Sequence, residues 1–284
     1  MSIVVTGATG HLGRHVIEGL LEKVPADRIT AVVRDEAKAA GFAARGVKIA
    51  VADYNAPETF DGLLSTGDKV LLISGNEFHL GRVGQHQVVI DAARAAGAAL
   101  LAYTSAPGNL TAALADDHRA TEEAILASGV PYSLLRNGWY NENYTENLAP
   151  VLEHGAVVQA AGDGRVAGAA RADYAAAAVA VLTGEGHENT TYELSGDTTF
   201  GIAEYAAEVA KHSGEEIAYN SVSPDVYLGI LTGAGLPEAL ATLLVGVEAS
   251  IEKGELAGTT GDLSRLTGRP TTPIAESVAA ALKG

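Results

Sequence analysis

The feature that most limits the fold of this chain is a glycine-rich turn near its N-terminus. A short apolar run leads into a G-x-x-G-x-x-G sequence over residues 7–13, and the amphipathic run His15 to Leu21 follows at once. In a strand–turn–helix unit of this kind, Gly7 permits the tight turn, Gly10 lets the backbone approach a pyrophosphate, and Gly13 allows close helix–strand packing. The helix N-terminus adds N–H donors. The turn therefore predicts a dinucleotide-binding fold.

Apolar runs alternate with helical segments through the first half of the chain. Each run is short, rich in β-branched residues and almost continuously apolar, which is typical of strands buried on both faces. The segments between them are long enough for crossover helices, so the strands are expected to run parallel. The pattern predicts an α/β fold with a doubly wound parallel Rossmann sheet. The expected strands are residues 3–5, 29–33, 47–52, 70–73, 100–104 and 132–135.

The regular alternation stops near Arg136, where a polar and aromatic stretch over residues 137–144 begins and includes the chain's one tryptophan. We expect an NAD(P)-binding Rossmann domain over residues 1–136 and a small, mainly substrate-side α+β lobe over residues 137–284. Residues 174–195 are expected to return in part to the sheet. In the lobe, the expected strands are residues 156–161, 191–194 and 216–220, and the expected helices are residues 174–182, 202–212, 237–251 and 274–282.

Charge and composition exclude several classes of function. The chain has 19 Lys and Arg against 35 Asp and Glu, and this net charge of −16 repels nucleic acids and anionic membranes. It has no cysteine, which excludes disulfides and Cys-based metal sites and fits a cytoplasmic protein. We read no signal peptide, and the apolar runs are shorter than the roughly 18 residues that span a bilayer. Neither a metal nor a nucleic-acid or membrane partner is expected, and a homodimer through residues 85–96 is a hypothesis.

The residue after the second strand selects between the two nicotinamide dinucleotides. A carboxylate there accepts the ribose 2′-OH of NAD, whereas an arginine pairs with the 2′-phosphate of NADP. Arg34 follows the expected strand about 20 residues after the glycines, and its planar fork suits a phosphate. NADP(H) is therefore preferred over NAD(H). Asp35 leaves open the alternative that both residues cap the following helix and that NADH is accepted.

Three further strand ends are expected to line the same groove, because ligands of open α/β sheets bind outside the carboxyl ends of the strands. Asp53 and Tyr54 are candidates for contact with the adenine, with ordinary loop residues as the alternative. The other two strand ends supply small polar residues that let the nicotinamide ribose approach. These are Ser74, Gly75, Asn76, Thr104 and Ser105.

A Tyr-x-x-x-Lys pair serves many short-chain dehydrogenases, in which the lysine lowers the phenol pKa for proton transfer. No tyrosine between Tyr103 and Tyr144 has a lysine four residues later. Alcohol oxidation by that mechanism is therefore disfavoured.

Several motifs along nearly the whole chain point to one family. They are residues 7–13, Arg34, residues 102–105, His118 with Thr121 and Glu122, and residues 134–144, 160–164 and 171–174. Together they resemble the type-2 NAD(P)H:quinone oxidoreductases, in the NmrA-like branch of the atypical short-chain dehydrogenases. That branch lies near the triphenylmethane-dye reductases and, more distantly, the isoflavone reductases.

The resemblance implies flavin-free hydride transfer from NADPH to a quinone. It also implies a set of cofactor-binding residues: Thr6, Gly7, Ala8, Thr9, Gly10, His11, Leu12 and Gly13 around the pyrophosphate, Arg34 at the 2′-phosphate, Ser74, Gly75 and Asn76 on the ribose side, and Asn137, Gly138, Trp139 and Arg171 in the rest of the cleft. His118 stands where the isoflavone reductases carry a lysine. It is a candidate proton relay because the ordinary pKa of histidine lies near working pH, with a surface histidine as the alternative.

Hydride transfer to a quinone needs a ring stacked over the nicotinamide and a donor to the developing oxyanion. The candidates for catalysis are Tyr103, His118, Tyr140 and Asn143, with Tyr144 as a further donor. The alternative for the aromatic residues is that they only pack the two parts of the chain together. Two other functions stay open. One is an NADP(H)-sensing regulator without catalysis, and the other is a reductase of dyes, imines or enol ethers.

Overall fold

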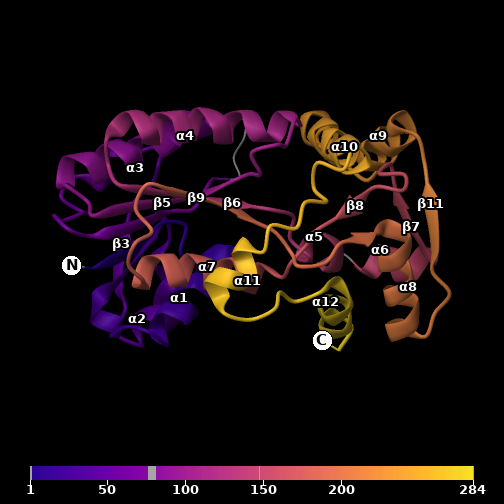
Figure 1. Ribbon diagram of the computed structural model, residues 1–284, viewed down its shortest axis with the longest axis horizontal. Coiled ribbons are helices and arrows are strands. Elements are labelled where there is room, and N and C mark those ends of the chain that lie inside the picture. Colours follow the sequence, from indigo (N-terminus) through magenta and orange to yellow (C-terminus); the bar gives the residue numbers. More distant parts are fainter. Residues whose placement is uncertain (1, 76–80, 147, 284) are drawn as a thin grey trace. The chain divides into compact units, whose positions relative to one another are not determined.

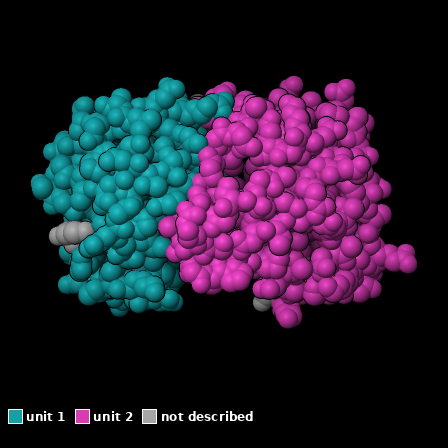
Figure 2. Space-filling model, viewed as in Figure 1, with its two compact units in different colours: residues 1–106, 117–137, 171–192 teal, residues 107–116, 138–170, 193–284 magenta. Residues whose placement is uncertain are grey.

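The structure, a computed structural model, describes residues 2–75, 81–146 and 148–283 (Figure 1). The chain forms two compact units, coloured separately in Figure 2. Unit 1 comprises residues 1–106, 117–137 and 171–192, and unit 2 comprises residues 107–116, 138–170 and 193–284. The chain therefore passes between the units several times, and the segment 107–116 belongs to unit 2 although it follows a strand of unit 1.

A seven-stranded sheet with the order β3-β2-β1-β4-β5-β6-β9 forms the centre of the Rossmann fold. The pairs among β1 to β6 are parallel, and Val4 of the central strand lies opposite Thr30 on one side and Val70 on the other. The strands are β1 (Ile3–Val5), β2 (Ile29–Val33), β3 (Lys48–Val51), β4 (Lys69–Leu72), β5 (Leu100–Ser105), β6 (Tyr132–Asn137) and β9 (Thr190–Leu194). The predicted doubly wound parallel sheet is confirmed.

Helices cover both faces of this sheet, which explains why its strands are apolar throughout (Figure 1). On one face, Ile90 and Ile125 pack against Val4, Val70 and Leu101. On the other, a Cβ atom on Gly19 would lie 3.0 Å from the Val179 side chain, so α1 and α7 pack closely. The helices of unit 1 are α1 (His11–Leu21), α2 (Ala40–Ala43), α3 (Arg82–Ala96), α4 (Asp116–Ser128) and α7 (Arg171–Thr183).

Unit 2 is an α+β lobe with two small sheets. β7 pairs with β11 in parallel, and β8 pairs with β10 antiparallel. Its aromatic core joins Tyr144 to Phe200 and Tyr205, with ring centroids 5.4 and 5.2 Å apart. The elements are α5 (Glu142–Thr145), α6 (Leu148–His154), β7 (Ala156–Gln159), β8 (Arg165–Val166), β10 (Phe200–Gly201), α8 (Ile202–Ser213), β11 (Ala218–Ser221), α9 (Pro224–Gly233), α10 (Glu238–Glu252), α11 (Asp262–Thr267) and α12 (Ile274–Ala281).

Within the described ranges, none of the helices combines the length and the apolar character needed to cross a membrane.

A buried carboxyl group ties α10 to the rest of unit 2. The Oε2 atom of Glu248 accepts the N–H of Ala160 at 3.1 Å, directly after β7. Burial raises the pKa of Glu248 to about 7, although hydrogen bonds from the backbone of Ala160 and Ala161 oppose the shift. The proton on this carboxyl group therefore links the stability of the folded state to pH.

Glu248 is expected to make the free energy of unfolding fall as the pH rises from about 4.5 to about 7. In this window the folded protein keeps the proton and the unfolded chain has lost it, so the loss is about 1.4 kcal/mol per pH unit. Glu248→Gln should remove this part of the slope, as measured by urea unfolding at pH 5, 6 and 7. The exposed Glu216→Gln is the control and should keep it. The same slope in Glu248→Gln as in the unmodified protein would contradict the interpretation.

Candidate functional site

The glycine-rich turn between β1 and α1 has no room for a side chain at Gly13. A Cβ atom there would lie 2.3 Å from the carbonyl oxygen of Gly7 and 2.8 Å from Cα of Ala8. Gly7 itself has a φ of 61°, a conformation that residues with a Cβ atom rarely adopt, and its carbonyl accepts the N–H of Gly10 at 3.0 Å. Helix α1 therefore starts directly against the turn that precedes it.

The N-terminus of α1 can receive an anion. Gly10, the N-cap residue, makes no side-chain cap hydrogen bond, and the first turn carries no acidic side chain. The first N–H groups of a helix have no partner within it, and the helix dipole places partial positive charge there. Gly7, Gly10 and His11 are exposed. These residues fit a dinucleotide pyrophosphate, as predicted from the spacing of the glycines.

Thr6 and Tyr54, both predicted to contact the cofactor, hold the strand ends next to the turn. The Thr6 hydroxyl donates to the Leu71 carbonyl at 3.1 Å and accepts the N–H of Ile73 at 3.2 Å. The Tyr54 hydroxyl donates to the Thr6 oxygen at 2.6 Å. Burial raises the pKa of Tyr54 to about 12, so its hydroxyl remains a neutral donor.

The residues after β2 and β3 have different surroundings. Asp35 accepts the N–H of Ala37 at 3.0 Å and caps the short 3-10 helix Glu36–Ala39, as the alternative for this pair expected. Arg34 is exposed, and its charge is close enough to oppose the rise in the Tyr54 pKa. Asp53 accepts the N–H of Asn55 at 2.9 Å and so shapes its own turn.

The backbone after β4 is held by two buried side chains. Thr104 accepts the N–H of Ser74 at 2.9 Å, and the Nε2 atom of His86 accepts the N–H of Gly75 at 3.0 Å. Of the three cofactor contacts predicted here, Asn76 lies outside the described residues. His86 was not predicted, and a histidine placed four residues into α3 gives no sequence signal that separates it from a surface residue.

The end of β5 carries an ion pair that the sequence did not indicate. The Ser105 hydroxyl donates to the Glu122 carboxylate at 2.6 Å, and Arg136 pairs with the same carboxylate at 2.6 Å. Glu122 is buried, so this pair holds α4 to the ends of β5 and β6. The predicted contacts Asn137 and Arg171 are also buried in unit 1, at the end of β6 and the start of α7.

Tyr103 and His118 meet in the interior of unit 1. Tyr103 has no exposed surface, and its hydroxyl lies 2.9 Å from Nδ1 of His118. Burial, together with the nearby charge of Arg82, lowers the pKa of His118 to about 3. The alternative of a surface histidine is therefore wrong, and the lowered pKa argues against a proton relay at this ring. Burial also raises the pKa of Tyr103, which keeps its hydroxyl neutral.

The other predicted donors belong to unit 2. Tyr140 pairs with Ala169 through a parallel bridge, and the exposed Asn143 donates its N–H to the Tyr140 carbonyl at 3.1 Å. Gly138 donates its N–H to the Leu194 carbonyl at 2.7 Å, and Trp139 is half-buried. Tyr144 is buried within the aromatic core of unit 2, where burial raises its pKa, so it packs this unit.

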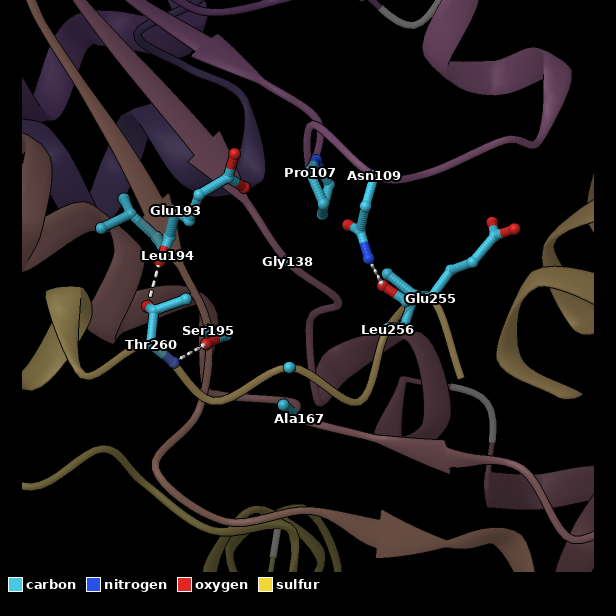
Figure 3. Close-up of a pocket in the computed structure, with 11 residues that line it drawn as sticks. Pro107, Asn109, Gly138, Ala167, Glu193, Leu194, Ser195, Glu255, Leu256 and Thr260 are labelled. Carbon is cyan, nitrogen blue, oxygen red and sulfur yellow. Dashed lines mark hydrogen bonds between the residues drawn. The ribbon is translucent and has the colours of Figure 1, made fainter. Parts of the chain in front are cut away.

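Unit 2 contains a pocket of about 280 Å³ that the sequence did not predict (Figure 3). Asn109 donates to the Glu255 carbonyl at 2.9 Å, and Thr260 donates its N–H to the Ser195 hydroxyl at 3.3 Å. The residues that line the pocket are Pro107, Asn109, Gly138, Ala167, Glu193, Leu194, Ser195, Glu255, Leu256, Gly258 and Thr260. Several of them follow the ends of β5, β6 and β9, so the strand-end rule extended to these loops would have found them.

The walls of this pocket are mostly apolar, with carboxylates at its edge. Glu255 accepts the N–H and the hydroxyl of Thr111 at 2.8 and 2.6 Å, and Glu193 accepts the N–H of Gly108 at 3.2 Å. Burial raises the pKa of Glu255, but the bonds from Thr111 outweigh it and hold that pKa below its usual value. No lysine or arginine lines the pocket, so it offers no charged partner to an anion.

Among the residues that the structure describes, no three or more His, Cys, Asp or Glu side chains gather in a way that could hold a metal ion.

Comparison with known proteins identifies the relatives of the chain. A family profile described as NAD(P)H-binding matches residues 7–185. Quinone oxidoreductase 2 of Escherichia coli is 45% identical over 97% of this chain and 97% of its own. Its crystal structure, described as an NADPH-dependent quinone oxidoreductase complexed with NADPH, superposes with a TM-score of 0.94 and covers 98% of this chain and 99% of that one.

Two further relatives are named as reductases. The Citrobacter sp. triphenylmethane reductase complexed with NADP(H) is 40% identical, with a TM-score of 0.93, and the match covers 99% of this chain and 100% of that one. The NAD(P)H azoreductase of Xenophilus azovorans is 30% identical over 96% of each chain. These similarities confirm the predicted family resemblance.

A side chain at Gly13 is expected to destabilise the fold, because its Cβ atom would overlap backbone atoms that have no way to move aside. Gly13→Ala should lower the free energy of unfolding by about 1–3 kcal/mol or more, which is the cost of overpacking. Gly84→Ala is the control, since Gly84 lies within α3 with open space around it and alanine favours helix by about 1 kcal/mol. Urea unfolding measures both variants, and equal stability of Gly13→Ala and the unmodified protein would contradict the close approach.

Proposed function

The chain belongs to the NmrA-like NAD(P)H-binding family of oxidoreductases, and we propose that it is a flavin-free, NADPH-dependent reductase of quinones and similar planar acceptors. The observation that carries the proposal is the exposed, uncapped start of α1 against the glycine turn, with the cation of Arg34 at the end of β2. An anion fits the first, and a 2′-phosphate fits the second.

The residues of unit 1 divide the binding of the cofactor among four strand ends. Residues 6–13 receive the pyrophosphate after β1, Arg34 binds the 2′-phosphate after β2, and Ser74 and Gly75 meet the ribose side after β4. Thr104 and Ser105 follow at the end of β5. When bound, the reduced nicotinamide supplies a hydride; with one proton from the medium or a side chain, this converts a quinone to a hydroquinone.

The protein's part in this reaction is to orient the acceptor and to stabilise the oxygen that gains charge. Tyr140 and Asn143 of unit 2 are the proposed donors, because burial already commits the Tyr103 hydroxyl and the His118 ring to each other. The pocket of unit 2 is the proposed seat of the acceptor ring, and its lining includes Gly138 of the same segment but neither of these donors. The names of the relatives favour this substrate class, since one is a quinone oxidoreductase, one an azoreductase and one a triphenylmethane reductase.

The remaining parts of the proposal follow from the sequence. They are the NAD(P)-binding domain over residues 1–136, the absence of flavin and metal from the reaction, a cytoplasmic location, and a small molecule rather than a nucleic acid or a membrane as partner. A homodimer is a further hypothesis of the same kind.

Arg34→Ala is expected to weaken the binding of NADPH and to leave the binding of NADH unchanged. A charge-assisted hydrogen bond contributes about 1.5–3 kcal/mol, so the KM for NADPH should rise roughly 10- to 100-fold while that for NADH stays within about twofold. Oxidation of each cofactor is followed at 340 nm with a naphthoquinone and no added flavin.

Arg45→Ala is the matched control for this experiment, because Arg45 is a surface arginine of unit 1 paired with Glu18 at 2.6 Å. It should change neither KM. Equal loss for NADPH and NADH in Arg34→Ala would refute the 2′-phosphate contact. Tight binding of NADPH by the unmodified protein without reduction of any quinone, dye or imine would refute the reductase and favour an NADP(H)-sensing regulator.

Gly258→Leu is expected to fill the pocket of unit 2 and to raise the KM for the quinone about tenfold. A Cβ atom on Gly258 meets nothing within 4 Å, so the side chain enters open space and the fold is kept. Gly229→Leu adds the same bulk at an equally open position on α9, outside the pocket lining. The KM for NADPH should stay unchanged in both variants. An unchanged quinone KM in Gly258→Leu would place the acceptor elsewhere.

A further inference from the structure

A chain of hydrogen bonds inside unit 1 starts at Arg82, and the donor and the acceptor of each bond can be assigned. This guanidinium is 2% exposed, and its NH2 group lies 3.0 Å from Nε2 of His118. Arginine has only donors, so Nε2 of His118 must accept. The proton of the neutral ring is then on Nδ1, which donates to the Tyr103 hydroxyl at 2.9 Å. The Tyr103 proton is left for its other partner, the Thr121 hydroxyl.

A second branch reaches the same threonine from the other side. The N–H of Gly75 donates to Nε2 of His86 at 3.0 Å, so the proton of this neutral ring is also on Nδ1. Nδ1 of His86 lies 2.9 Å from the Thr121 oxygen. Thr121 donates its own proton to the Asp117 carbonyl at 2.7 Å. The Thr121 oxygen therefore accepts from both His86 and Tyr103.

The groups around the network keep both rings neutral. Burial first and the Arg82 charge second lower the pKa values of His86 and His118 to about 3. The Asp117 carboxylate lies 3.7 Å from this guanidinium. A ring protonated on both nitrogens would have no acceptor for Gly75. The histidines therefore act here as fixed hydrogen-bond groups and not as acids or bases.

The network ends on the backbone that follows β4, where the chain leaves the sheet. His86 takes the Gly75 amide and Thr104 takes the Ser74 amide, so two consecutive N–H groups point into unit 1. Neither amide can then bind a phosphate. The groups that this turn can still offer to a ligand are carbonyl and hydroxyl oxygens, which accept hydrogen bonds. The hydroxyl groups of a ribose are donors and therefore suit them.

We propose that His86 is a positioning residue for the nicotinamide ribose of the cofactor, acting through the Gly75 amide and oriented by Thr121. This proposal rests on the proposed function, because it takes Ser74 and Gly75 as the ribose side of the NADPH site. Removing the acceptor leaves the partly buried Gly75 N–H without its protein partner, which lets this turn rearrange. The protein should then bind the nicotinamide half of the cofactor more weakly, while its affinity for the adenosine half should not change.

The test compares NADPH with 2′,5′-ADP, which has the 2′-phosphate but no nicotinamide half. His86→Phe keeps the ring shape and removes the acceptor, and it should raise the Kd for NADPH about tenfold while changing that for 2′,5′-ADP less than twofold. His86→Gln places an oxygen near the former Nε2 and should restore most of the affinity. His187→Gln is the control, because His187 belongs to unit 1 and bonds Tyr192 outside the network.

Two further readouts keep the test decisive. Thr121→Val removes the partner of His86 Nδ1 at a residue that is not a proposed cofactor contact and should give the same split, so it replaces His86→Phe if that variant does not fold. Nitrogen-15 NMR of the unmodified protein should show both His86 and His118 as neutral Nδ1–H rings from pH 5 to 8.

The outcomes separate this proposal from the proposed function. The positioning role alone would be overturned by an equal loss of affinity for NADPH and 2′,5′-ADP, by no loss of affinity for either, or by a protonated Nε2 on His86. An unmodified protein that binds no NADPH would overturn the proposed function and the positioning role with it.

Discussion

The contact between Gly13 and the backbone of Gly7 and Ala8 is the constraint on which the site depends. Because a Cβ atom at Gly13 would lie 2.3 Å from the Gly7 carbonyl, α1 can begin right against the turn only if this residue is glycine. That approach places the start of α1 at the carboxyl end of β1, where the helix dipole acts on whatever binds there. The remaining binding residues, at the ends of β2, β4 and β5, follow from the parallel sheet.

Buried polar side chains fix the strand ends around this turn. Thr6 and Tyr54 tie β1 to the residues after β4, and Thr104 and His86 take the two amides that follow. Such groups are costly to bury unless each donor meets an acceptor, and here they come from the ends of β1 and β3, from β5 and from α3. The buried polar side chains of unit 1 therefore fix the backbone at one edge of the sheet. In the proposed function, the cofactor supplies the chemistry.

The sequence was sufficient for the parts that depend on local pattern. Continuous apolar runs located the strands of the sheet within two residues, and the glycine spacing located the turn. Short elements of unit 2 such as β8, β10 and α11 were missed because two to six residues carry too little periodicity. The roles of His118 and His86 were not predictable either, since burial decides the pKa of a histidine and burial comes from residues distant in sequence.

The charged residues predicted to contact the cofactor also differ in their surroundings, because these surroundings depend on the fold. Asp35 and Asp53 are each engaged in a local turn, as small acidic residues in loops often are, whereas Arg34 stays exposed. The pocket of unit 2 draws on segments around residues 107, 138, 194 and 256, which no single motif joins. The pocket as a whole could therefore be recognised only from the structure.

A crystal structure of the protein with bound NADPH tests the central claim most directly. We predict that the pyrophosphate oxygens lie within hydrogen-bond distance of backbone N–H groups at the start of α1, that the 2′-phosphate contacts Arg34, and that the nicotinamide ribose lies against Ser74 and Gly75. A dinucleotide bound away from the glycine turn, or a 2′-phosphate directed away from Arg34, would contradict the account.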